Sequence, residues 1–142
     1  MQNPRTLSCA AAAVISLVAA ALAQSDTLKA RLAPVPVESS TLAGMTGSGA
    51  ATGTLSGRSL SVNGTFEGMQ SPATAAQIHL GPKGIRGPAV FDLTVTKAPS
   101  GTIGGTFVLT PEQIEAVKRG SFYIQIHSEK APDGNLWGWL LP

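Results

Sequence analysis

Short segments in which apolar and polar residues alternate run along most of the chain, and turn-forming residues separate them. Residues 59–68 show this pattern clearly, since Leu60, Val62 and Phe66 all fall on even positions. Successive strand side chains point to opposite faces, so such a segment has one apolar face. The chain also carries 16 glycines and 10 prolines among its 142 residues. Many short strands with frequent turns are typical of a β-sandwich or a barrel, and we predict an all-β, antiparallel, Greek-key-like β-sandwich of about eight strands.

The predicted strands follow one another with short connections, which favours antiparallel pairing. The pair Asn63-Gly64 lies inside the third strand. Such a pair often forms a hairpin turn, but the apolar phase is kept across it, so we predict a bulge or bend there. The eight predicted strands are residues 24–32, 49–55, 59–68, 74–80, 89–95, 102–109, 121–128 and 135–141.

One short helix is predicted, over residues 110–119. Thr110 is a suitable N-cap, Pro111 takes the first helical position and Gln113 completes a capping box. Gly120 follows the segment and favours the end of a helix. The helix therefore interrupts the series of strands once.

The first 23 residues are typical of a secretory signal peptide. Arg5 precedes an apolar run over residues 10–22, and Ala21-Leu22-Ala23 fits a cleavage site. This run of 13 residues is shorter than the roughly 20 needed to span a bilayer. We predict cleavage after residue 23, one exported domain over residues 24–142 without a transmembrane segment, and a periplasmic or extracellular location. The only cysteine, Cys9, is lost with the signal peptide, so no disulfide is expected.

Charge and motifs argue against two functional classes. The formal net charge is +2 and the basic residues are scattered apart from Lys118-Arg119, so we exclude nucleic acid as a partner. The sequence contains no Gly-x-Ser-x-Gly motif and no phosphate-binding loop. Ser128 directly follows His127, and adjacent strand residues point to opposite faces, so these two cannot form a catalytic pair. We therefore expect no enzyme.

Both histidines of the chain lie in predicted strands with the same local pattern. Gln77 and His79 occupy alternate positions in one strand, as Gln125 and His127 do in another. If the two strands are neighbours, all four polar side chains share one face. Both imidazoles could then approach one point on the surface.

Two imidazoles with one or two further ligands can bind copper or zinc. The candidate ligands that lie near His127 in the sequence are Glu129 and, in the next turn, Asp133. The alternative is that each histidine bonds the backbone of a neighbouring loop, residues 81–88 or residues 129–134. The sequence leaves both interpretations open.

The last predicted strand is apolar on both faces. Trp137, Trp139 and Leu141 share one face, and Leu136 and Leu140 share the other. Either both faces are buried, or the indoles lie at the surface and contact a partner. Tryptophan is frequent at binding hot spots because it combines a large area with one hydrogen-bond donor.

Four segments occur in the order that a known family shows: residues 76–79, 84–91, 120–128 and 131–140. They resemble the chordin-type domain, CHRD, in which a His-Ile-His-Gly segment is followed by a Gly-x-x-Gly-Pro loop. A Tyr-x-x-x-His segment then leads to Pro-Gly-Gly-Glu-x-Arg-Gly-x-Leu. The resemblance extends roughly from Thr27 to the C-terminus. It implies an exported β-sandwich module, of a kind found in an extracellular growth-factor antagonist, without an agreed catalytic mechanism.

Four positions depart from the family pattern, and at one of them Trp139 stands where a polar residue is usual. The first family histidine is Gln77 here, the family glutamate corresponds to Asn135, and the family arginine corresponds to Trp137. A polar outer face has thus become more aromatic, which favours a contact surface.

These observations lead to two functional predictions. The first is a non-enzymatic exported CHRD binding module that contacts an extracytoplasmic protein or ligand through Trp137, Trp139, Gln77 and Gln125. The alternative is a periplasmic protein that binds copper or zinc through His79, His127 and Glu129.

Overall fold

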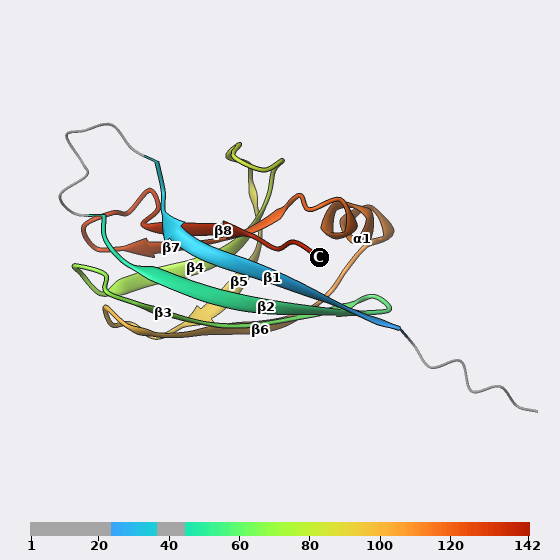
Figure 1. Cartoon of the computed structure of the whole chain (residues 1–142), viewed down its shortest axis with the longest axis horizontal. Coiled ribbons are helices and arrows are strands. Elements are labelled where there is room, and N and C mark those ends of the chain that lie inside the picture. Colours follow the sequence, from blue (N-terminus) through green and yellow to red (C-terminus); the bar gives the residue numbers. More distant parts are fainter. Residues whose placement is uncertain (1–23, 37–44) are drawn as a thin grey trace, which may run out of the picture.

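The computed structural model describes residues 24–36 and 45–142 (Figure 1). The predicted signal peptide, residues 1–23, lies outside the described residues. Within the described part of the chain, no helix is long and apolar enough to cross a membrane.

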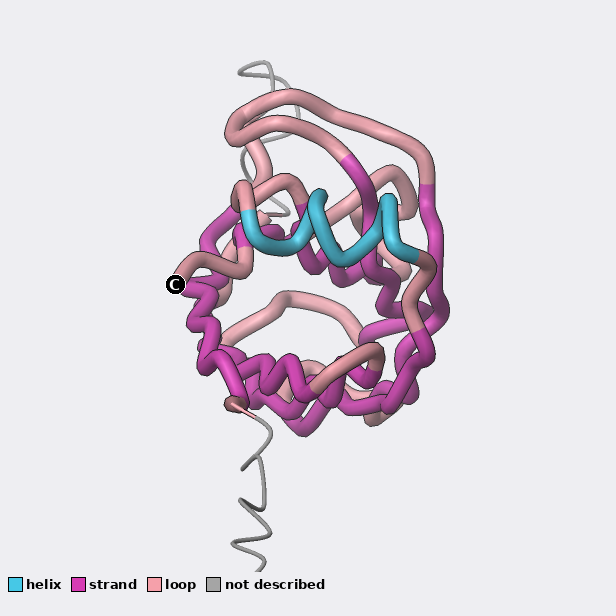
Figure 2. Tube along the Cα trace, turned by 90° about the vertical axis from the view of Figure 1, so that its right-hand side faces the viewer, coloured by secondary structure: helices cyan, strands magenta, loops and turns pink. Residues whose placement is uncertain are grey.

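Eight strands close into one antiparallel barrel, in the order β1-β2-β3-β6-β5-β4-β7-β8. Figure 2 shows these strands as a ring, with the helix α1 crossing one end. The elements are β1 (Ser25–Pro34), β2 (Ser48–Ser56), β3 (Ser59–Glu67), β4 (Ala73–Leu80), β5 (Ala89–Val95), β6 (Gly101–Val108), α1 (Pro111–Lys118), β7 (Phe122–Ser128) and β8 (Leu136–Trp139).

The closed barrel corrects the predicted β-sandwich, because two strands each join both sheets. β1 pairs with β2 over Ser25–Leu32 and with β8 at Ala33 and Pro34. β5 pairs with β4 along most of its length and with β6 at Thr94 and Val95. Alternation along a strand defines an inner and an outer face in either architecture, so it cannot reveal whether the two sheets are joined.

The predicted fold class, strand number and helix agree with the structure. The fold is all-β and antiparallel, with eight strands and one short helix. β4, β5 and β6 are consecutive neighbours and β3 lies beside β6, which is a Greek-key arrangement.

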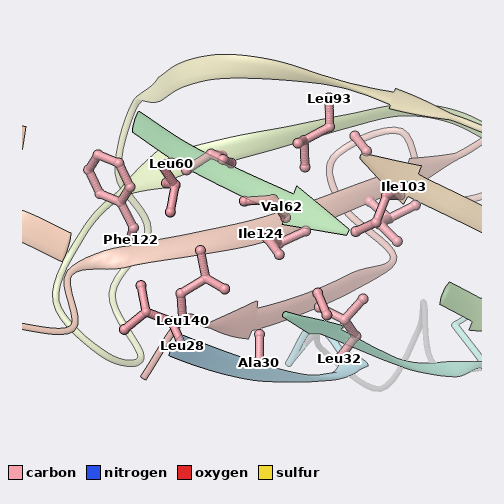
Figure 3. Packing of buried hydrophobic residues seen from close by; sticks show 14 of the residues in the cluster. Leu28, Ala30, Leu32, Leu60, Val62, Leu93, Ile103, Phe122, Ile124 and Leu140 are labelled. Atoms are coloured by element: carbon pink, nitrogen blue, oxygen red, sulfur yellow. The ribbon is translucent and has the colours of Figure 1, made fainter. Parts of the chain in front are cut away.

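The barrel interior is filled by apolar side chains from every strand. Alternation places them inward, and removing this area from water is the main stabilising term of such a fold, at about 25 cal/mol per Å². Leu60, Val62 and Phe66, which share the even positions of β3, are all at most 2% exposed. Residues of this cluster that Figure 3 labels are Leu28, Ala30, Leu32, Leu60, Val62, Leu93, Ile103, Phe122, Ile124 and Leu140.

The Asn63-Gly64 pair makes neither a hairpin nor the predicted bulge. β3 pairs with β2 without interruption, and Gly64 lies opposite Ala51. A Cβ atom on Gly64 would lie 2.6 Å from the Ala50 carbonyl oxygen and 2.8 Å from the Ala51 Cβ atom. Glycine is therefore required there by the close approach of β2 and not by a bend.

The helix α1 forms where the capping signals predicted it. The Thr110 side chain accepts a hydrogen bond from the Gln113 backbone, and the Gln113 side chain accepts one from the Thr110 backbone. Beyond the helix, Gly120 has a φ of 74°, a left-handed conformation that favours glycine. Ala116 and Val117 are buried in the main core, so the helix closes that end of the barrel.

Candidate functional site

Strands β4, β7 and β8 lie side by side and carry the predicted site residues on their outer face. Gln77 pairs with Gln125, which pairs with Trp137 on its other side. The residues between them along each strand, such as Ile78 and Ile124, point into the core. The predicted shared face of the two Gln-x-His strands is thus present.

The two imidazoles lie close together, with ring centres 6.4 Å apart. The antiparallel register sets His79 opposite Tyr123 and His127 opposite Ala75, so the two backbones are two same-face positions apart along the strands. The close approach of the rings is therefore made by the side chains. Two side chains on the same face of a sheet do not have to lie this close together.

Each histidine is held by the backbone of a loop. His79 Nδ1 lies 2.8 Å from the Gly87 carbonyl oxygen, and His127 Nδ1 lies 2.8 Å from the Pro132 carbonyl oxygen. A carbonyl oxygen only accepts hydrogen bonds, so both Nδ1 atoms carry the proton. In the neutral rings both Nε2 atoms then present a lone pair. The loop contacts expected as the alternative exist, and they leave Nε2 available.

The two loops, residues 81–88 and 129–135, fold over this outer face. The first follows β4 and projects beyond the barrel in Figure 1, where it is yellow-green. The Arg86 guanidinium in this loop donates to the Asp133 carbonyl oxygen in the other loop, at 3.0 Å. The loops cover the outer face of β7, whose inner face lies in the core, so that Tyr123 is 0% exposed and Gln125 is 2% exposed.

An aromatic cluster forms beneath the loops. The Tyr123 ring stacks on His79 at 5.0 Å and lies 4.7 Å from Trp139, which in turn lies 4.6 Å from Trp137. The Tyr123 hydroxyl accepts a hydrogen bond from the Gly87 backbone at 2.9 Å. Tyr123 was missed by reasoning from the sequence, although it precedes Gln125 by two residues and therefore shares its face.

The two tryptophans have different environments. Trp139 is only 8% exposed, and its indole nitrogen donates to the Gly81 carbonyl oxygen at 2.9 Å. Trp137 is partly exposed, and the Arg86 guanidinium lies 5.9 Å from its ring centre. Only Trp137 therefore has a face open to a partner, while Trp139 anchors a loop.

Two buried polar atoms in the described residues have no hydrogen-bond partner: His79 Nε2 and Gln125 Oε1. The Gln125 amide nitrogen donates to the Asp133 carbonyl oxygen at 3.0 Å and lies 3.5 Å from His127 Nε2. Both unpartnered atoms are lone-pair acceptors, and leaving such an atom unpaired costs about 1–3 kcal/mol. The two histidines and Gln125 thus form one group in which two acceptor atoms, His79 Nε2 and Gln125 Oε1, lack a donor.

The other predicted site residues lie outside this group. Gln77 donates to the Asp92 carboxylate at 2.9 Å. Glu129 is exposed, and no three or more His, Cys, Asp or Glu side chains gather at a metal-binding distance in the ranges 24–36 and 45–142. The structure therefore does not bring Glu129 together with the two imidazoles.

A surface groove of about 550 Å³ runs beside the aromatic cluster, between β1, β2, β8 and the first covering loop. Three basic side chains line it, those of Lys29, Arg31 and Lys83, and no acidic residue does. Trp137 and Trp139 form its aromatic side. Reasoning from the sequence missed this groove because the basic residues come from segments far apart in the chain.

A family model described as the CHRD domain matches residues 19–140, nearly the whole chain. Comparison with curated proteins and with solved structures found no significant match.

Proposed function

The chain belongs to the CHRD family, and we propose that it is an exported, non-enzymatic binding module that recognises its ligand in the groove beside Trp137. The observation that supports this proposal is the composition of the groove, in which a partly exposed indole lies beside three basic side chains.

The charge of the groove points to an anionic ligand. Lys29 and Arg31 occupy alternate outward positions of β1, and Lys83 approaches from the loop after β4. An exposed ion pair contributes about 0.2–1 kcal/mol. Three such contacts confer selectivity for a negative ligand, and salt weakens them.

The closed barrel limits the shape of that ligand. β1 pairs with β2 along most of its length, and on its other side it pairs with β8 at Ala33 and Pro34 and with Leu141 at Lys29, so the groove offers only a short unpaired stretch of strand edge to an extended peptide. Small residues, including Ala33, Ala50 and Gly138, line the groove and leave room beside the indole of Trp137. A pyranose ring that carries a carboxylate can place an apolar face on the indole and its charge beside the basic side chains, so we infer an acidic carbohydrate.

Calorimetry of the purified protein with polygalacturonate and with neutral dextran tests this function. We expect binding to polygalacturonate alone, and at least about tenfold weaker binding when salt rises from about 50 to about 500 mM. Trp137→Ser and the double variant Arg31→Ala/Lys83→Ala should each weaken binding by about three- to tenfold or more.

Lys118→Ala is the matched control, because Lys118 lies at the end of α1 and does not line the groove. It should leave the affinity unchanged. Equal binding to dextran, or full affinity in the Arg31→Ala/Lys83→Ala variant, would show that the groove is not the recognition surface. Selective binding of an acidic peptide instead would reject the carbohydrate.

A further inference from the structure

We propose that His79, His127 and Gln125 form a binding site for one late first-row divalent metal ion, with copper(II) bound most tightly. The donor atoms are the two imidazole Nε2 atoms and the Gln125 amide oxygen. This site adjoins the aromatic cluster, because the Tyr123 ring stacks on His79. None of its three donor residues lines the groove.

The tautomers of the two histidines are set as metal binding requires. Both Nδ1 atoms donate to loop carbonyl oxygens, of Gly87 and Pro132, at 2.8 Å. Histidines that bind metals usually donate their other ring N–H to a carbonyl or carboxylate in this way, which fixes the ring and directs the free lone pair at the ion. Here two loops perform this task, one for each ring.

The buried side-chain atoms that lack a hydrogen-bond partner belong to this same group. His79 Nε2 and Gln125 Oε1 are buried lone-pair acceptors without a donor, and His127 Nε2 meets only the Gln125 amide nitrogen at 3.5 Å. A bound cation would satisfy the two unpartnered lone pairs and replace the long contact at His127 Nε2. No other described buried side-chain atom lacks a partner.

The separation of the rings permits a shared ion. Metal–nitrogen bonds to histidine are about 2.0–2.1 Å long, so two imidazoles on opposite sides of one ion have ring centres about 6.5 Å apart, and any smaller angle at the ion brings them closer. The observed separation is 6.4 Å. Gln125 lies on the same face of β7, two residues before His127. Its amide is held by the Asp133 carbonyl oxygen beside the rings.

The chemistry of the donors selects the ion. Two imidazole nitrogens and one amide oxygen are neutral ligands of intermediate softness, which suit copper(II) and zinc(II) better than calcium or magnesium. Among divalent ions at such a site copper(II) binds more tightly than zinc(II). Both histidine residues are partly exposed, whereas His79 Nε2 and Gln125 Oε1 are buried, so the proposed site lies just below the surface.

Metal titration of the untagged, EDTA-treated protein tests the proposal. Calorimetry should show one copper(II) ion per chain with a Kd of about 1 μM or below, and zinc(II) binding at least about tenfold more weakly. Electron paramagnetic resonance of the copper form should show hyperfine coupling to two imidazole nitrogens. His127→Gln and His79→Gln should each weaken copper binding by at least about tenfold.

Two further variants distinguish the loss of a metal ligand from a loss of the fold. Gln125→Met retains the shape of the side chain without the amide oxygen, and we expect weaker binding and a changed copper spectrum. Glu129→Gln is the matched control, and it should bind copper like the unchanged protein because Glu129 lies outside the group. Binding no tighter than about 100 μM, or full affinity in a folded His127→Gln variant, would overturn the proposal and leave a water molecule as the missing partner.

Discussion

Gly87 anchors the loop that covers the candidate site. Its carbonyl oxygen bonds His79, and its backbone N–H bonds the Tyr123 hydroxyl. A Cβ atom at this position would lie 1.7 Å from the Leu80 carbonyl oxygen. The residue is therefore glycine because the loop and the end of β4 touch there, and any side chain must displace the loop.

The substitution Gly87→Ala should destabilise the protein by about 1–3 kcal/mol, because the clash with the Leu80 backbone cannot be relieved by a rotamer change. Urea denaturation monitored by tryptophan fluorescence measures this loss. Gly53→Ala is the matched control, since its Cβ would meet only side-chain atoms at 3.4–3.6 Å. That variant should be neutral or stabilised by up to about 1 kcal/mol. Equal losses in the two variants would contradict the role of Gly87.

Two elements differ in what stabilises them. The helix α1 has only eight residues, and isolated helices of that length are unstable in water, so it depends on its cap and on packing of Val117 in the core. β7 lies between the barrel core and the covering loops, which makes it the most thoroughly buried strand near the site. A cap can be recognised locally, whereas burial on both faces of a strand depends on distant loops.

The capping box of α1 should show coupled energetics. Thr110→Ala should cost about 1 kcal/mol, and Gln113→Ala should cost somewhat less. Each side chain bonds the other residue's backbone at 2.9–3.2 Å, so the two losses should not add in the double variant. A double-mutant cycle from urea denaturation gives this coupling. Additive losses would indicate that the two bonds act independently.

The two sheets of the barrel meet at two short seams, and one of them, between β1 and β8, has two paired positions and an isolated bridge between Lys29 and Leu141. β5 and β6 share two paired positions, whereas β4 and β7 share seven. Gly104 and Gly105 on β6 add little packing there, although Phe91 and Phe107 stack across the seam at 4.6 Å. The fold therefore resembles two sheets that are joined through only a few backbone pairs at β1 and at β5.

Hydrogen exchange should reveal this difference. Amides paired between β5 and β6 should exchange at least about tenfold faster than those paired between β4 and β7, because local opening of a short ladder exposes less apolar surface. Exchange measured by NMR on the native protein provides the rates. If the amides of Thr94 and Val95 were among the slowest, the seam would not be the site of opening.

Several features followed from local patterns. The outward direction of Gln77, His79, Gln125 and His127 is a consequence of strand alternation, and the limits of α1 follow from Thr110 and Gly120. Family membership was likewise visible in the order of short motifs and agrees with the match over residues 19–140. Each of these features depends on residues a few positions apart.

The remaining features depend on contacts between distant segments. Closure of the barrel, the 6.4 Å approach of the imidazoles and the burial of Trp139 but not Trp137 all arise from strand register and from loops folded over β7. The alternation of side chains along a strand predicts on which face of the sheet a side chain lies, but not which segments cover that face. The backbone repeat is local, whereas pairing and coverage join segments that are tens of residues apart, so the candidate site became visible only when those segments were brought together.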